Sequence, residues 1–278
     1  MSTRTTWPPP LPSSGTDPTG PPRRRRPPAL GVAALVCVGA VLVAAAVTGD
    51  REPVGDRTVG EVTRVGVHHG GAIPDYLETA AGELAGPPAT PVADAAGAGE
   101  WALVSLTDYL PPQRLAEVVG EVPVSVVLAR VPLTGRQTEI VRMSALRLPD
   151  DAVAAMAEVA EGKDREAADQ RARSAALTDA DEEQVRLRRV YDSGAEVAAA
   201  EAQAYRSGCA CLYAVVVRAA RPALRKLAAH PQVRAVDPAP EVRRLDRTVF
   251  TPPLPEQHDL ARPPADDLLD PVRSPEPS

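Results

Sequence analysis

Cys209 and Cys211, separated by one residue, are the side chains of this sequence best suited to chemistry. Residues i and i+2 of a strand project to the same face, so the two sulfur atoms can approach each other. Three interpretations stay open: a buried structural pair, a disulfide within or between chains, and a metal or redox site. The last has least support, because the spacing is not C-x-x-C and no second cysteine pair occurs.

The other polar motifs favour structural roles. Adjacent His68 and His69 could bind a metal together with nearby carboxylates, but neighbouring strand positions point in opposite directions, which favours an exposed turn. The acids Asp150–Asp151 and Asp181–Glu183 stand at expected helix starts, where the helix dipole explains them. The sequence has no G-x-S-x-G, H-E-x-x-H, phosphate-loop or dinucleotide pattern. We therefore predict no enzyme activity, catalytic residue, cofactor or metal.

Residues 29–48 form an uncharged apolar run of about 20 residues, long enough to cross a bilayer as a helix. Arg23, Arg24, Arg25 and Arg26 directly precede it, and the positive-inside rule places them in the cytoplasm. We expect a single-pass anchor in the lipid bilayer of the cell membrane, with the C-terminal domain outside. A cleaved signal peptide is the alternative, but the run exceeds the usual 7–15 apolar residues.

Charge is distributed unevenly along the chain. Residues 1–28 hold five Arg and one acid, whereas the remainder holds 26 basic and 36 acidic residues. An acidic domain argues against binding to nucleic acid.

The two ends of the chain are rich in proline. Residues 1–28 and 241–278 are expected to be mostly disordered tails. We expect the part of the second tail near Phe250 to fold back, because this is the only Phe and would otherwise be exposed. Residues 49–99 predict a short strand at 59–67, a helix at 74–84 that begins with Pro74, and a linker at 86–99.

Residues 100–240 predict an α+β domain built from two β-α-β units. Two such units in one chain suggest a ferredoxin-like sandwich of four antiparallel strands with two helices on one face. The expected strands are 101–106, 122–131, 212–217 and 233–236, with helices opened by Pro111–Pro112 and Pro222.

A helical hairpin interrupts this domain at 149–206. Its Ala-rich, charged helices are expected at 149–176 and 178–205, with Thr178 as N-cap and Gly208 as the stop signal. Apolar residues of the second helix, including Val190, recur at coiled-coil-like spacing. This face must cover the partner helix, the sheet or a second copy.

Two resemblances add to these expectations. The segments VGVHHGGAIPDYLETAAGELAG (65–86), WALVSLTDYLPPQRLAEVV (101–119) and SGCACLYAVVVRA (207–219) resemble single-pass, membrane-anchored proteins of high-GC Gram-positive bacteria, which implies an anchor but no particular activity. Residues 212–241 are similar to the second half of subtilisin-propeptide-like inhibitor domains. Those domains are ferredoxin-like and inhibit through a C-terminal tail, so this similarity implies the fold more than the function.

The sequence thus predicts a non-enzymatic interaction module of the cell envelope. The hairpin at 150–206 is the expected surface for an envelope protein or for self-association. A small-ligand-binding sensor and a protease-inhibitor module are the alternatives.

Overall fold

The computed structural model of the chain describes residues 62–87, 99–264 and 266. The expected tail 1–28 with Arg23 to Arg26, the expected anchor 29–48 and most of the linker 86–99 lie outside the described residues. Within the described ranges, no helix has both the length and the apolar character needed to cross a membrane. The described part is an α+β fold, as predicted.

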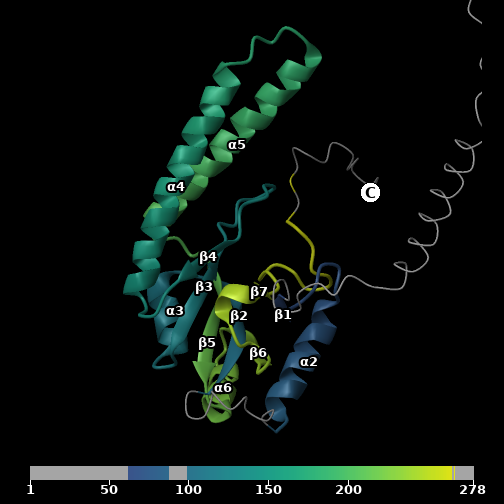
Figure 1. Ribbon diagram of the computed structural model, residues 1–278, viewed down its shortest axis with the longest axis vertical. Coiled ribbons are helices and arrows are strands. Elements are labelled where there is room, and N and C mark those ends of the chain that lie inside the picture. Colours follow the sequence, from purple (N-terminus) through teal and green to yellow (C-terminus); the bar gives the residue numbers. More distant parts are fainter. Residues whose placement is uncertain (1–61, 88–98, 265, 267–278) are drawn as a thin grey trace, which may run out of the picture. The chain divides into compact units, whose positions relative to one another are not determined.

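A five-stranded antiparallel sheet forms the centre of the fold (Figure 1). Its strand order is β4-β3-β5-β2-β6, so β2 and β5 lie in the middle. The strands are β2 (Glu100–Leu110), β3 (Val124–Ala129), β4 (Val141–Ser144), β5 (Leu212–Ala219) and β6 (Val233–Ala239). The sequence predicted four of these strands and missed β4.

Two short helices connect the sheet strands and cover one face. α3 (Pro112–Val119) joins β2 to β3, and α6 (Arg221–Ala228) joins β5 to β6. Each carries proline in its first turn, where the missing N–H has no intrahelical acceptor to lose. Leu115 of α3 and Leu224 of α6 are fully buried against Val104 of β2 in the main apolar core.

The opposite face of the sheet is covered by segments from both ends of the described chain. β1 (Thr63–Gly66) pairs in parallel with β7 (Thr248–Thr251), which follows a short 3-10 turn at Leu245–Arg247. Phe250 is buried there against Leu103 of β2 and Tyr213 of β5. The fold-back around Phe250 is therefore confirmed, but the prediction of a tail from 241 onward was wrong for residues 241–264.

Arginines of the sheet fasten this returning segment. Arg142 of β4 donates hydrogen bonds to the carbonyl oxygens of Thr248 and Leu245, both at 2.8 Å. Arg234 of β6 donates to the carbonyl oxygens of Leu254, at 3.1 Å, and Gln257, at 2.6 Å. The guanidinium groups thus satisfy backbone carbonyls of the returning segment, so this irregular, Pro-rich segment can pack closely against the sheet.

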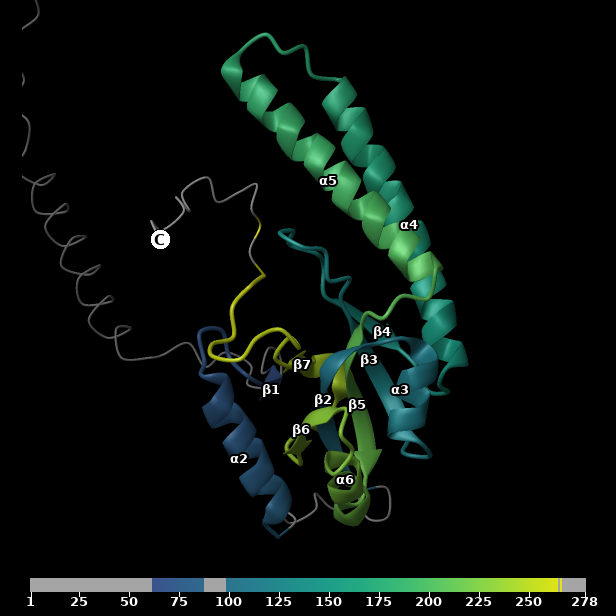
Figure 2. The ribbon, with the colours of Figure 1, turned by 180° about the vertical axis from the view of Figure 1, so that it is seen from behind.

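Helix α2 (Ile73–Ala85) lies along the edge strand β6 (Figures 1 and 2). It buries Ile73, Ala80 and Leu84. The segment expected as a separate juxtamembrane piece, 49–99, thus contributes β1 and α2 to the same folded unit.

The predicted hairpin consists of α4 (Asp150–Ala175) and α5 (Glu182–Arg206), which lie side by side (Figure 2). Their seam is built from small residues spaced three and four apart, as in a coiled coil. The apolar members of the seam are Ala152, Met156, Ala160 and Ala167 in α4, and Ala195, Ala198, Ala202 and Tyr205 in α5.

Two details of the hairpin prediction were wrong. The N-cap of α5 is Asp181, whose carboxylate accepts from the Gln184 amide at 2.9 Å, whereas the Thr178 hydroxyl bonds to the Gln184 side chain. Val190, expected on the buried face, is 48% exposed. The stop at Gly208 is confirmed, because this residue adopts φ 70° directly after α5.

Candidate functional site

The two cysteines that the sequence singled out are joined. Cys209 and Cys211 form a disulfide between α5 and β5, with Cα atoms 5.3 Å apart. Cys211 is fully buried and its backbone carbonyl accepts from the Arg130 amide at 2.8 Å. The bond holds the point at which the chain leaves the hairpin and enters the central strand. No group of three or more metal-binding side chains occurs among the described residues.

A charged cluster connects the two helices of the hairpin with Glu139, which lies between β3 and β4. Lys163 of α4 is 7% exposed, and its Nζ contacts carboxylate oxygens of Glu139 at 2.8 Å, Glu166 at 3.0 Å and Glu201 at 3.0 Å. Burial disfavours the charged ammonium, but hydrogen bonds to the three carboxylates outweigh this and raise the pKa of Lys163. Burial also raises the pKa of Glu201, despite its ion pair with Lys163.

A second buried charge ties the C-terminal segment to the sheet. Arg130 is 3% exposed and follows β3 directly. Its guanidinium donates to Glu256 at 2.7 Å and to the Tyr109 hydroxyl at 2.9 Å. This contact could not be predicted from the sequence, because the two partners of Arg130 lie 126 and 21 positions away.

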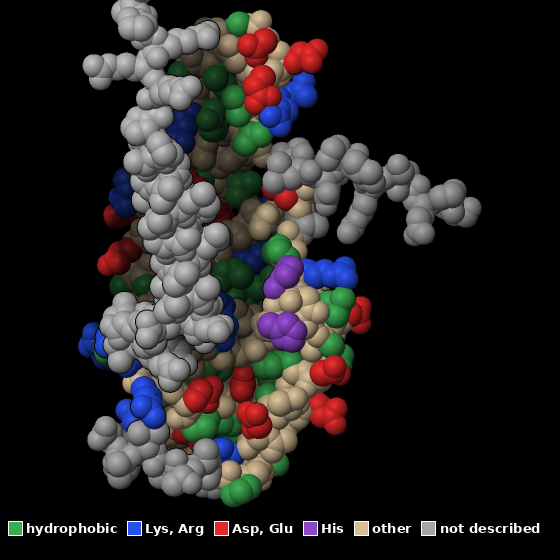
Figure 3. Space-filling model, turned by 45° about the vertical axis from the view of Figure 1, so that its right-hand side comes forward, with side chains coloured by type: hydrophobic (Ala, Val, Ile, Leu, Met, Phe, Trp, Pro, Cys, Tyr) green, Lys and Arg blue, Asp and Glu red, His purple; other side chains and the backbone are tan. Residues whose placement is uncertain are grey.

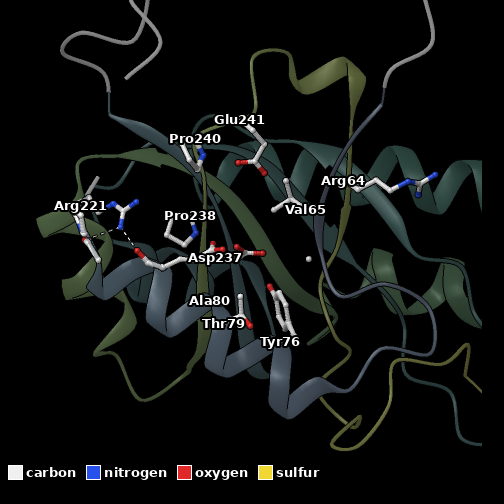
Figure 4. Close-up of a pocket in the computed structure, with 14 residues that line it drawn as sticks. Arg64, Val65, Tyr76, Thr79, Ala80, Arg221, Asp237, Pro238, Pro240 and Glu241 are labelled. Carbon is white, nitrogen blue, oxygen red and sulfur yellow. Dashed lines mark hydrogen bonds between the residues drawn. The ribbon is translucent and has the colours of Figure 1, made fainter. Parts of the chain in front are cut away.

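A cavity of about 610 Å³ lies between α2, β1 and the end of β6. Its lining is partly apolar, with Val65, Ala80, Pro238 and Pro240, and partly charged. Figure 4 shows the Asp237 carboxylate and the Tyr76 hydroxyl pointing toward each other inside it.

Asp237 is the unusual group of this cavity. It is 8% exposed, and its contacts are with the Tyr76 hydroxyl and the backbone of Gly66 rather than with a cation. Burial, together with the neighbouring carboxylates of Glu83 and Glu241, raises the pKa of Asp237 to about 6, although the hydrogen-bonding contacts with Tyr76 and Gly66 act in the opposite direction. The carboxyl group therefore changes charge near neutral pH.

Two hydroxyl groups beside Asp237 are also poorly satisfied. The hydroxyls of Tyr76 and Ser105 are buried, and neither makes a hydrogen bond of normal geometry with the described residues. Burial, and then the Asp237 carboxylate, raise the pKa of Tyr76 far above its ordinary value. A buried hydroxyl left without a partner costs about 1–3 kcal/mol, so this group of polar atoms is suited to receiving a ligand or water.

The two arginines near the cavity are directed elsewhere. Arg221 donates to Glu100 and to the backbone carbonyls of Glu83 and Gly86. These bonds connect the start of α6 with the end of α2. Arg64 points away from the cavity in Figure 4. Neither guanidinium is an ion-pair partner of Asp237 in the described structure.

The remaining sequence candidates lie apart from this cavity's interior. His68 and His69 are exposed beside the turn at Gly70, as expected. Asp151 lies in the first turn of α4, as expected, and accepts from the backbone amides of Leu146 and Arg147 before the helix at 2.9 and 2.8 Å, which lowers the pKa of its carboxyl.

Asp237 was missed because its significance depends on packing. The signal in the sequence was an acid directly after the predicted strand 233–236 and directly before Pro238. Tyr76 could be assigned to a helix, but nothing in the sequence indicated that this helix would lie against residue 237.

Comparison with known proteins adds no further assignment: no protein-family model, curated protein or solved structure matches this chain. The candidate sites therefore rest on the geometry of the chain itself.

Proposed function

We propose that this chain is a membrane-anchored, non-enzymatic protein of the cell envelope that binds a protein partner through the α4–α5 hairpin. The observation that carries this proposal is the extension of the hairpin beyond the apolar core of the domain. A 26-residue helix is about 39 Å long at 1.5 Å per residue. Only its beginning, around Ala152, Met156 and Ala160, joins the core that covers the sheet.

Farther along, the two helices support each other. The Ser174 hydroxyl bonds to Asp192, Gln170 lies against Gly194, and Arg188 pairs with Asp179 at 2.7 Å. Side chains of both charges gather over the distal end of the hairpin at the top of Figure 3. Nearer the sheet, Arg136 and Glu139 of the β3–β4 segment bond to residues of both helices, whereas the contacts named above lie between the helices and their connecting loop. A charged arm whose outer part is held mainly by its own two helices is suited to recognition by a polar protein surface.

A partner other than a second copy fits this surface best. The apolar face that could have joined two copies already covers the partner helix within the same hairpin. What is left outside is mainly charged, with isolated apolar residues such as Val190.

The fold assignment within this proposal is a ferredoxin-like sandwich with an added edge strand. It is supported by the antiparallel order β3-β5-β2-β6 and by α3 and α6 on one face. The hairpin and β4 then form an insertion between the two β-α-β units. The N-terminal anchor at 29–48 is supported by sequence alone.

The compartment is part of the proposal. Disulfides persist in oxidising surroundings, so the bond between Cys209 and Cys211 supports an extracytoplasmic domain. This agrees with the cytoplasmic placement of Arg23 to Arg26.

The inhibitor alternative loses support from the C-terminal segment. An inhibitor of the propeptide type needs a free tail after its last strand. Here Arg234 and Arg130 hold residues 254–257 against the sheet, and β7 pairs with β1.

Site-specific photocrosslinking tests the interaction proposal. A photoreactive amino acid replaces Val190 of α5 in the full-length chain, and a matched variant carries it at Val249 of β7, which is 39% exposed. After irradiation of intact cells, products are resolved without reducing agent and identified by mass spectrometry.

We expect position 190, but not position 249, to give one reproducible adduct with another envelope protein. Equal adducts from both positions, or none from position 190, would contradict the proposal. Adducts only between copies of the chain would replace the partner with self-association.

A further inference from the structure

We propose that the cavity between α2, β1 and β6 is a binding site for a small organic cation that carries a primary ammonium or guanidinium group. This site lies on different elements from the hairpin and goes beyond the interaction function proposed above. Its central residue is Asp237, with the hydroxyl group of Tyr76 beside it, and Ser105 lies behind Tyr76 rather than in the lining.

The charge of the lining selects a cation. Asp237, Glu83 and Glu241 contribute three carboxylates. Arg221 is neutralised by Glu100, and the guanidinium of Arg64 is directed away from the interior (Figure 4). A ligand with positive charge therefore meets uncompensated negative charge, and an anion would be repelled.

The hydrogen-bonding atoms select a donor-rich group. An ionised carboxylate only accepts hydrogen bonds, whereas each hydroxyl accepts as well as donates. An ammonium or guanidinium group presents several N–H donors, which can bind the Asp237 carboxylate and the hydroxyl oxygen of Tyr76 together. Such a ligand would supply the partners that these buried atoms lack in the described protein.

The size and walls of the cavity fit a small molecule with an aliphatic body. A volume of about 610 Å³ lies within the usual range for small-ligand sites. Val65, Ala80, Pro238 and Pro240 give an apolar surface against which methylene groups can pack. A metal ion fits less well, because no three metal-binding side chains converge in the part of the chain that is described.

The groups that face Asp237 also predict the pH dependence of binding. They are Tyr76 and Glu83 of α2, Glu241 after β6, and the backbone of Gly66 in β1. Since Asp237 loses its charge below a pKa of about 6, affinity for a cation should fall as the pH decreases from 8 to 5.

The test measures binding of named probes to the purified full-length chain. Isothermal titration and thermal unfolding are followed in amine-free phosphate buffer with 1,5-diaminopentane, L-arginine methyl ester, glutarate and Mg²⁺. We expect saturable binding of at least one organic cation. At about a hundredfold excess over Kd, the unfolding temperature should rise by roughly 5 °C or more. Glutarate and Mg²⁺ should give no comparable shift.

Three substitutions identify the site. Asp237→Asn should weaken cation binding at pH 8 at least about tenfold, because it removes the charge but keeps the shape. Tyr76→Phe should weaken binding by a smaller factor. Glu158→Gln, at an exposed position of α4, removes one negative charge elsewhere and should leave binding unchanged.

Asp237→Asn relieves an unpaired buried charge, so it should fold at least as well as the native chain, and a loss of binding would not reflect unfolding. Undiminished binding by this variant would overturn the proposal. So would stronger binding of glutarate or Mg²⁺ than of either organic cation, or no saturable cation binding at millimolar concentration.

Discussion

Replacement of Asp237 by Asn should stabilise the protein at high pH and leave it unchanged at low pH. The substitution keeps the size of the side chain but removes the buried charge. In the folded chain the pKa of Asp237 rises from an ordinary value of 3.8 to about 6. The folded state therefore binds a proton on this residue more tightly than the unfolded state does.

The sign and magnitude follow from proton linkage. Between pH 4 and 6 the folded state carries more protons on Asp237 than the unfolded state, so the contribution of this group to stability falls as the pH rises. One unit of pKa corresponds to about 1.4 kcal/mol, so a rise of about two units gives a penalty of roughly 3 kcal/mol above pH 7. The substitution Asp237→Asn should therefore raise the free energy of unfolding by at most this amount above pH 7. Near pH 4 it should leave the free energy of unfolding almost unchanged.

Urea unfolding at pH 8, 6 and 4 measures this gain in the full-length chain. Trp101 in β2 pairs with Ala239 and Arg218, so its fluorescence reports on the sheet. Because m depends on the surface exposed on unfolding, equal m values for the two proteins would show that only stability differs. Glu158→Gln is the control for loss of one exposed charge. A stability gain of equal size at pH 8 and pH 4, or a loss that grows with pH, would refute this account of Asp237.

Three further substitutions test other parts of the fold. Lys163→Met leaves the carboxylate of Glu201 buried without an opposite charge, so urea unfolding at pH 7 should show a loss of about 3–5 kcal/mol; a loss below about 1 kcal/mol would contradict a buried ion pair. Gly66→Ala places a Cβ against the Thr251 carbonyl at a φ of 109°, so the unfolding temperature should fall by several degrees, while Gly82→Ala, which meets nothing within 4 Å, should not lower it. Replacing both cysteines by Ser should cost about 1.6 kcal/mol for the loss of a three-residue loop closure, plus about 1–3 kcal/mol for the hydroxyl buried at position 211; a loss well above about 5 kcal/mol would show a further role of the disulfide.

Local patterns in the sequence predicted most of the elements. The apolar run at 101–106 became β2, and Pro111–Pro112 and Pro222 marked the starts of α3 and α6 within one residue. β4 was missed because it has four residues and buries only Met143, too short a stretch for alternation to be visible. α5 begins later than expected because Asp179 adopts a φ of 54° and Asp181 provides the cap.

The contacts that create the candidate site could not be predicted in the same way. Periodicity shows which residues share a helix face, but it does not show which strand that face meets. Tyr76 and Asp237 come together because α2, which follows β1, lies along the edge strand β6. The C-terminal segment returns through β7, which pairs with β1. Likewise, no pattern paired Arg130 with Glu256, since a single buried ion pair leaves no repeat in the sequence.

The buried charges of the chain provide the strongest argument that Asp237 has a function. Among the described residues, Arg130 has Glu256 as a partner, and Lys163 and Glu201 neutralise each other. Asp237 alone among these buried charges has no opposite charge. If packing were its only role, Asn would fill the same space without the penalty of a desolvated charge. An unpaired carboxylate that lowers stability and lies beside a cavity is instead expected where a ligand provides the missing charge. Residues that bind a ligand often lower the stability of the ligand-free protein. Stabilisation of Asp237→Asn together with loss of cation binding would therefore demonstrate both effects in one variant.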